Sequence, residues 1–136
     1  MRLFNIIKNL SEVKTQTWTP TFKWSTAETS PTVANSNCYI DKIGNLYCFR
    51  GRFQITAVNA PSANDMLVFG TPFGLKNSGV ATVGELIYTD KTISAPLLFR
   101  VSSAQVLYVT GGTGGGNSSQ YFKTGYYSFC FFWFKA

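Results

Sequence analysis

The sequence predicts an all-β protein with an antiparallel sandwich or jelly-roll architecture. Residues 37–56 contain two runs of aromatic and branched side chains joined at Gly44 and Asn45, residue types that tolerate the positive φ angles of a tight hairpin turn. In all, about eight to ten short runs of this kind follow one another at regular spacing, with turn residues between them. The length of 136 residues suits one domain with a substantial core.

Residues 2–13 carry the only helical pattern in the chain. Apolar side chains recur at spacings of three, four and three residues, as in a coiled coil, at Leu3, Ile6, Leu10 and Val13. Phe4 and Ile7 widen this stripe. Two heptads are too short to be stable alone, so this helix must pack on its own domain, on copies of itself or on a docking partner. Because no second helix is predicted, we favour the last two.

The chain therefore divides into residues 1–14, an anchor or oligomerisation segment, and residues 15–136, the β-domain. Within 15–24 polar and aromatic residues alternate, and Pro20 interrupts them, which indicates an edge or a bend. Residues 25–36 are predicted to be a polar loop, 59–65 a turn cluster and 111–119 a glycine-rich loop. The other predicted strands cover residues 38–43, 46–56, 66–69, 80–88, 92–100, 105–110, 120–123 and 126–135.

The last predicted strand is apolar on both faces. One face carries Tyr127, Phe129, Phe131 and Trp133, and the other carries Tyr126, Cys130, Phe132 and Phe134. A strand of an ordinary two-layer domain buries one face only. The second face is therefore expected to meet another subunit or another layer, which is an independent indication of oligomerisation.

The hairpin register decides how the cysteines are interpreted. A two-residue turn at Gly44 and Asn45 places Ile43 opposite Leu46, Asp41 opposite Cys48, and Cys38 opposite Gly51. Cys38 and Cys48 then lie on opposite faces and cannot bond to each other. Three sparse cysteines favour free thiols and assembly in a reducing cytoplasm, with a Cys48–Cys130 bridge as the alternative.

Charge is sparse and slightly basic. Only 13% of residues are charged and the net charge is +6, but the basic residues are scattered; the nearest approach to a cluster is Arg50 and Arg52 on one strand face. Nucleic-acid binding, which needs a patch, is not expected, whereas weak attraction to anionic surface polymers is compatible. No secretion signal and no run of about 20 apolar residues is visible, so membrane insertion is not expected.

No pattern for catalysis or for metal binding is present. The chain has no histidine, and its cysteines form no metal motif, so no cofactor or metal is predicted. Asp65 and Asp90 could form a carboxylate pair after folding, but solvated turn residues are the favoured interpretation. The glycine-rich loop lacks the ending of a phosphate loop and is either a plain connection or a mobile ligand-contacting loop. Trp18, Trp24 and Tyr39 are more simply core residues than a sugar-stacking platform.

Several segments resemble a β-domain found in bacteriophage tail and fibre proteins. TWTPTFKW at residues 17–24 is similar to its Trp-Thr-Pro-Thr opening, and YIDKIGNL at 39–46 resembles its Tyr-x-Lys-Ile-Gly-Asn-Leu/Val hairpin with one extra residue. GRFQIT at 51–56 resembles the strand that follows, and FGTPF at 69–73 resembles its Gly-Leu-Pro-Phe turn with Thr71 in place of the leucine. The C-terminal aromatic strand is similar in position. The resemblance covers residues 15–136 loosely.

The resemblance implies a trimeric, non-enzymatic β-sandwich displayed on a virion that is assembled in the host cytoplasm. With only the 2–13 helix before the domain, a small knob or decoration protein is expected, attached to capsid or tail proteins through that helix. The expected ligand-contacting loop residues are Gly114, Asn117, Ser118 and Tyr121, and the ligand would be a glycan of the host surface. A carbohydrate-binding module and a polysaccharide depolymerase are the alternatives.

Overall fold

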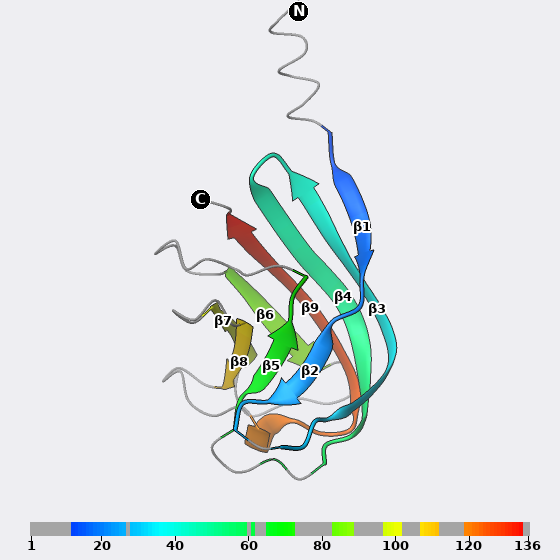
Figure 1. Cartoon of the computed structure of the whole chain (residues 1–136), viewed down its shortest axis with the longest axis vertical. Helices are drawn as coiled ribbons and strands as arrows, with labels where there is room; N and C mark the ends of the chain where they lie inside the picture. The colour runs from blue at the N-terminus through cyan, green and yellow to red at the C-terminus, as the bar shows by residue number, and fades with distance from the viewer. Residues whose placement is uncertain are drawn as a thin grey trace, which may run out of the picture.

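The computed structural model describes residues 12–26, 28–59, 61, 65–72, 83–88, 97–101, 107–111 and 119–134. Within these ranges the chain forms nine β-strands and one short 3-10 helix (Figure 1). The elements are β1 Lys14–Trp18, β2 Thr21–Trp24, β3 Thr32–Ile43, β4 Leu46–Ala57, β5 Leu67–Gly70, β6 Val83–Tyr88, β7 Leu97–Val101, β8 Leu107–Gly111, η1 Ser119–Tyr121 and β9 Gly125–Phe134. The predicted all-β, antiparallel class is confirmed.

The strands form one antiparallel sheet in the order β1-β3-β4-β9-β6-β7-β8-β5-β2. Its two edge strands, β1 and β2, follow each other in the chain with only Thr19 and Pro20 between them. The sheet therefore curls until its edges approach, as the path of β1 into β2 shows (Figure 1). Proline cannot donate to a strand ladder, so the predicted break at Pro20 is where the chain passes from one edge to the other.

The core inside the curled sheet is mainly aromatic. Phe53 of β4 lies 5.6 Å from Phe69 of β5 between ring centroids, and Phe129 of β9 lies 5.5 Å from the same Phe69 ring. These contacts join strands that are distant in the sheet order, so the two halves of the sheet face each other across the core. Trp18 and Trp24 are also buried in this core, as the simpler interpretation predicted. For Tyr39 that interpretation is wrong, because Tyr39 lies on the opposite, outward face of β3 and is only half-buried.

The hairpin register is as predicted. Ile43 pairs with Leu46, Asp41 with Cys48 and Cys38 with Gly51, and Gly44 has a φ angle of 58°. The polar loop predicted over residues 25–36 is wrong at its end, because β3 already begins at Thr32. Irregular pairing between Ala34 and Asn37 lets this polar stretch follow β4, so its backbone hydrogen bonding overrides its local composition.

Two further expectations differ from the structure or lie beyond it. The strand predicted at residues 120–123 is instead the 3-10 turn η1, in which the Phe122 amide donates a hydrogen bond to the Ser119 carbonyl. The helix predicted over residues 2–13 lies outside the described residues except at its end. There, Glu12 and Val13 are not helical, and 51% of Val13 is exposed.

Strand β9 occupies the middle of the sheet between β4 and β6 and alternates strictly. Tyr127, Phe129, Phe131 and Trp133 point into the core, as the sequence pattern predicted. Phe132 and Phe134 point outward and are 45% and 55% exposed in the single chain. The second apolar face of the last strand is thus open to solvent in this chain, and it belongs to the surface described next.

Candidate functional site

The outward side chains of β3, β4 and β9 form a continuous surface that we call the outer face. The end near the hairpin turn is apolar and is made by Ile43, Leu46, Phe132 and Phe134, which we call the apolar half. The other end is made by Tyr39, Asp41, Arg50, Arg52 and Tyr126, which we call the arginine half. Cys48 and Cys130 lie at the border between the two halves.

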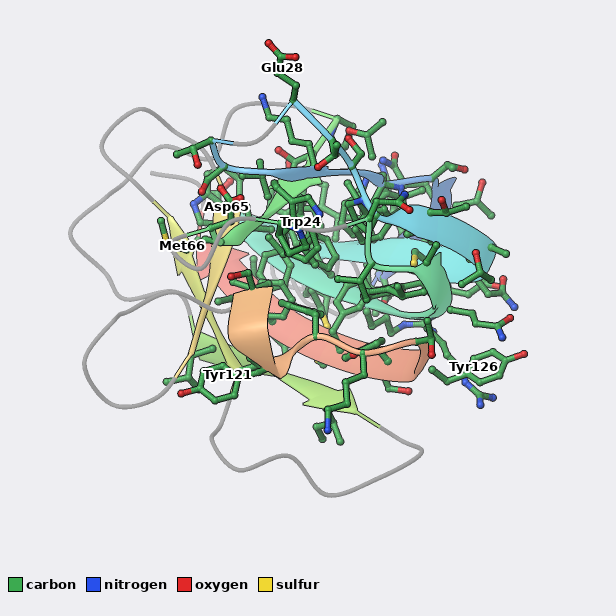
Figure 2. The ribbon with its side chains drawn as sticks, turned by 90° about the horizontal axis from the view of Figure 1, so that it is seen from below. Trp24, Glu28, Asp65, Met66, Tyr121 and Tyr126 are labelled. Atoms are coloured by element: carbon green, nitrogen blue, oxygen red, sulfur yellow. The ribbon has the colours of Figure 1, made fainter. Side chains whose placement is uncertain are left out.

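The arginine half is ordered by charge and by aromatic rings. Arg50 Nε donates a hydrogen bond to Asp41 Oδ2 at 2.6 Å, and its guanidinium lies 4.8 Å from the ring centroid of Tyr39. The guanidinium of Arg52 lies 4.1 Å from the ring centroid of Tyr126. Figure 2 shows Tyr126 pointing outward from the side of the molecule. The shared face of Arg50 and Arg52 was predicted from their spacing, and both side chains are exposed there.

Asp41 is the electrostatic centre of the arginine half. The hydrogen bond from Arg50, followed by one from Thr15 Oγ1 at 2.6 Å, lowers the pKa of Asp41 below its ordinary value of 3.8. The same carboxylate raises the pKa of Arg50. Because Thr15 belongs to β1, Asp41 to β3 and Arg50 to β4, this one carboxylate links three strands.

Two more exposed apolar side chains lie on the outward side of β6 and β7, level with the arginine half rather than with the apolar half. Ile87 pairs with Ser128 and Leu98 pairs with Glu85, positions that share the outward side of the sheet. Six large apolar side chains are exposed in the described part of the chain, and five of them lie on this side: Ile43, Ile87, Leu98, Phe132 and Phe134. Such concentration on one face is typical of an interaction surface, because scattered exposure is the usual arrangement.

Two cysteine thiols meet at the border of the two halves. Cys48 Sγ and Cys130 Sγ are 3.5 Å apart, and both cysteines are free thiols. Burial first, and then the hydrogen bond with Cys130, raises the pKa of Cys48 to about 12. Cys38 lies on the opposite, inner face, where burial raises the pKa of its thiol. The predicted separation of Cys38 from Cys48 is confirmed.

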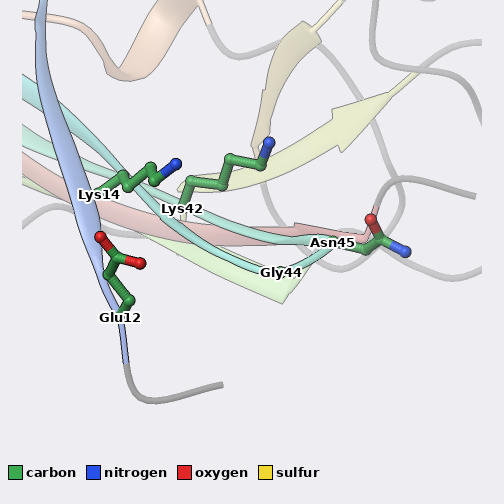
Figure 3. A pocket seen from close by; sticks show the side chains of 5 residues that line it. All are labelled: Glu12, Lys14, Lys42, Gly44 and Asn45. Carbon is green, nitrogen blue, oxygen red and sulfur yellow. The ribbon is translucent and has the colours of Figure 1, made fainter. Parts of the chain in front are cut away.

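A basic hollow lies on the other side of the hairpin. Lys14 and Lys42 are directly opposite each other in the β1–β3 register and line two adjoining hollows of about 270 and 320 Å³. Figure 3 shows the first of them. Glu12 and Asn45 also line the first, and Gln16 lines the second. Like charges directly opposite each other in a sheet repel, so an anion bound between the two ammonium groups would relieve that repulsion.

Asp65 is buried rather than solvated, which corrects the prediction. Its carboxylate Oδ1 accepts hydrogen bonds from the Thr26 amide at 2.8 Å, from Thr26 Oγ1 at 2.6 Å and from Ser25 Oγ at 3.2 Å. Its carbonyl accepts one from the Ser119 amide, so the residue joins the end of β2 to η1. Figure 2 shows Asp65 next to Met66 and Trp24 at this end of the sheet. These bonds give Asp65 a structural role; Asp90, its suggested partner, lies outside the described residues.

Most site residues predicted from the sequence lie outside the described ranges. They are Leu3, Ile6, Ile7, Leu10, Gly114, Asn117 and Ser118, and their roles stay predictions. Val13 is exposed just before β1, and Tyr121 is partly buried in η1 against the aromatic core. The basic hollow was missed, because its two lysines come together only through the pairing of β1 with β3. No local pattern in the sequence signals that pairing.

Comparison of the chain with family models, curated proteins and solved structures found no match. In the part of the chain that the structure describes, no helix has the length and apolar character needed to cross a membrane. Among those same residues, no three metal-ligating side chains gather at one place. The surfaces described above therefore carry the functional interpretation.

Proposed function

We propose that this chain is a non-enzymatic structural protein of a bacteriophage virion. In this proposal it forms a small trimeric head of the β-sandwich type, attached to capsid or tail, that contacts the host surface. The resemblance of residues 17–24 and 39–46 to phage fibre domains supports the virion assignment. The concentration of exposed apolar side chains on the outer face supports self-association.

One observation carries the self-association. The five outward apolar side chains come from four strands, β3, β6, β7 and β9, and two of them, Phe132 and Phe134, lie on β9 in the middle of the sheet. Each fully buried phenylalanine contributes about 1.5–3 kcal/mol relative to an exposed one, so a subunit contact over Phe132 and Phe134 would be strongly favourable. Subunits joined there would keep the arginine half at the margin of the contact, where polar side chains are usual.

Analytical ultracentrifugation of the full chain tests the oligomeric state. We expect the mass of three chains at micromolar concentration, and a stable monomer would contradict the proposal. The virion location needs a separate measurement. Antibody against this chain should label the capsid or the tail in electron micrographs of particles, and labelling of neither would contradict the structural role.

The basic hollow favours a second candidate function, the binding of an anionic glycan of the host surface. Lys14 and Lys42 supply two adjacent positive charges, and Gln16 and Asn45 supply hydrogen-bonding groups beside them. We expect a sulfated polysaccharide to be retained by the wild-type chain and released by the Lys14→Gln, Lys42→Gln double variant. Lys23→Gln, an exposed lysine on β2, is the matched control and should bind as the wild type does. Equal binding by all three chains would exclude the hollow as the site.

A further inference from the structure

Cys48 and Cys130 stand next to each other on hydrogen-bonded neighbouring strands. Cys48 pairs with Phe132 and Cys130 pairs with Arg50, so the two cysteines are diagonal neighbours on the outer face of β4 and β9. Their sulfur atoms, 3.5 Å apart, need to approach to about 2.05 Å to form a disulfide. Because diagonal neighbours on antiparallel strands have Cα atoms about 7–8 Å apart, closing that difference takes rotation of both side chains together with a small approach of the two strands.

We infer that Cys48 and Cys130 are a site of oxidative cross-linking, in which a low-molecular-weight disulfide converts the two free thiols into one intramolecular disulfide. The inference does not depend on the proposed virion role. It also distinguishes these two cysteines from Cys38, which is buried on the inner face and faces Gly51 across the hairpin.

The reaction proceeds by two exchanges. Cys130 is the more exposed of the two, so its thiolate attacks one sulfur of the reagent, forms a mixed disulfide and releases the first reagent thiolate. Cys48 then loses its proton, attacks Cys130 Sγ and displaces the second reagent thiolate. The two protein thiols are oxidised, the reagent disulfide is reduced to two thiols, and these take up the two protons.

The cross-link would raise the stability of the folded domain while changing its shape little. The two cysteines are 82 positions apart in the sequence, so the bond would close a long loop of the unfolded chain. Closing a long loop lowers the entropy of the unfolded state and so favours the folded one. The chain would fold with free thiols in a reducing compartment and be locked after transfer to an oxidising one.

The test uses the full reduced chain treated with oxidised glutathione, followed by thiol titration under denaturing conditions. We expect the number of titratable thiols to fall from three to one, with a Cys48–Cys130 peptide in the digest and a higher urea midpoint than for the reduced chain. Cys38→Ala should still form the same cross-linked peptide. Cys48→Ser should stop at a mixed disulfide on Cys130, with no rise in midpoint.

Three results would overturn the inference. The first is that all three thiols persist in the folded chain under conditions that oxidise a model dithiol. The second is a cross-linked peptide that contains Cys38. The third is cross-linking between chains instead of within one. Because the first measurement is made on the wild-type chain, it stands even if a cysteine variant fails to fold.

Discussion

Asp41 joins three strands through a single side chain, and its contribution to stability should depend on pH. In the folded chain Arg50 and Thr15 hold its pKa below the ordinary value of 3.8. A carboxyl with a lowered folded pKa stabilises the protein above the unfolded pKa, and that stabilisation disappears as the pH falls through the folded value. The contribution of Asp41 is therefore complete at neutral pH and lost in acid.

Asp41→Asn should lower stability at neutral pH, and the difference from the wild type should shrink as the pH is lowered from about 5 to about 2. Urea unfolding across that range measures the difference. The effect should be small, because exposed ion pairs contribute little. Glu28→Gln, at an exposed site away from the outer face, is the control and should show no comparable trend. A difference that is constant over the whole range would contradict the role given to the ion pair.

Asp65, unlike the exposed Asp41, makes its hydrogen bonds in a buried position. Its Oδ1 accepts three hydrogen bonds from Ser25 and Thr26, and its side chain is fully buried. Asp65→Ala would remove the acceptor of all three hydrogen bonds and should cost roughly 1–3 kcal/mol of unfolding free energy. Asp65→Asn keeps an acceptor oxygen and should cost less. Urea unfolding of both variants gives the comparison, and equal stability of the alanine variant and the wild type would contradict the structural role.

At the scale of elements, the hairpin depends on close contact at Gly51. A Cβ atom at this position would lie 2.8 Å from the Asn37 carbonyl oxygen and 2.8 Å from Cys38 Cα, both backbone atoms of the facing strand. Backbone cannot yield as a flexible side chain can, so Gly51→Ala should destabilise the fold by about 1–3 kcal/mol. Thermal unfolding measures the loss.

Combining Gly51→Ala with Cys38→Ala shows whether the sulfur atom or the backbone of the facing strand limits the space at position 51. It removes the Sγ atom, which would lie 2.6 Å from the new Cβ, but leaves both backbone contacts in place. The double variant should therefore recover little of the stability that Gly51→Ala loses. Full recovery would show that the sulfur atom alone limits the space, and would contradict the backbone explanation.

The sequence predicted those elements whose determinants are local. The turn at Gly44 and Asn45 sets the register of the whole hairpin, and Pro20 marks the break between β1 and β2. The sequence did not predict that β3 begins as early as Thr32, because pairing with β4 determines where this strand begins. The burial of Asp65 escaped for the same reason, since its partners Ser25 and Thr26 lie about 40 residues away in the chain. The arginine half followed from strand alternation, whereas the basic hollow required the docking of β1 on β3.

At the scale of the whole molecule, the outer face of the sheet consists of an apolar half and a polar, charged half. Its apolar half offers area for a contact between subunits, and its arginine half carries the charged and aromatic side chains that would lie at the margin of that contact. Both halves include side chains of β4 and β9, and the inner faces of these two strands pack in the same aromatic core. The proposed subunit contact and the basic hollow would therefore lie on opposite faces of the same hairpin.

The apolar half gives the sharpest test of how subunits associate. Phe132→Thr with Phe134→Thr removes two outward rings and keeps residues suited to strands, so the single chain should remain folded. If each ring contributes about 1.5–3 kcal/mol to a subunit contact, association should weaken by on the order of 10²-fold or more per subunit. Sedimentation should then show monomers at concentrations where the wild type is trimeric.

Two further variants distinguish association through the apolar half from association through residues 2–13. Lys23→Thr changes an exposed strand position without removing apolar area and should leave the trimer intact. Leu3→Ser with Leu10→Ser disrupts the predicted helical stripe instead. If the proposed trimer survives loss of the two phenylalanines but dissociates in the leucine variant, residues 2–13 hold the subunits together and the outer face does not. Dissociation in both would mean that neither contact is sufficient alone and that the two act together.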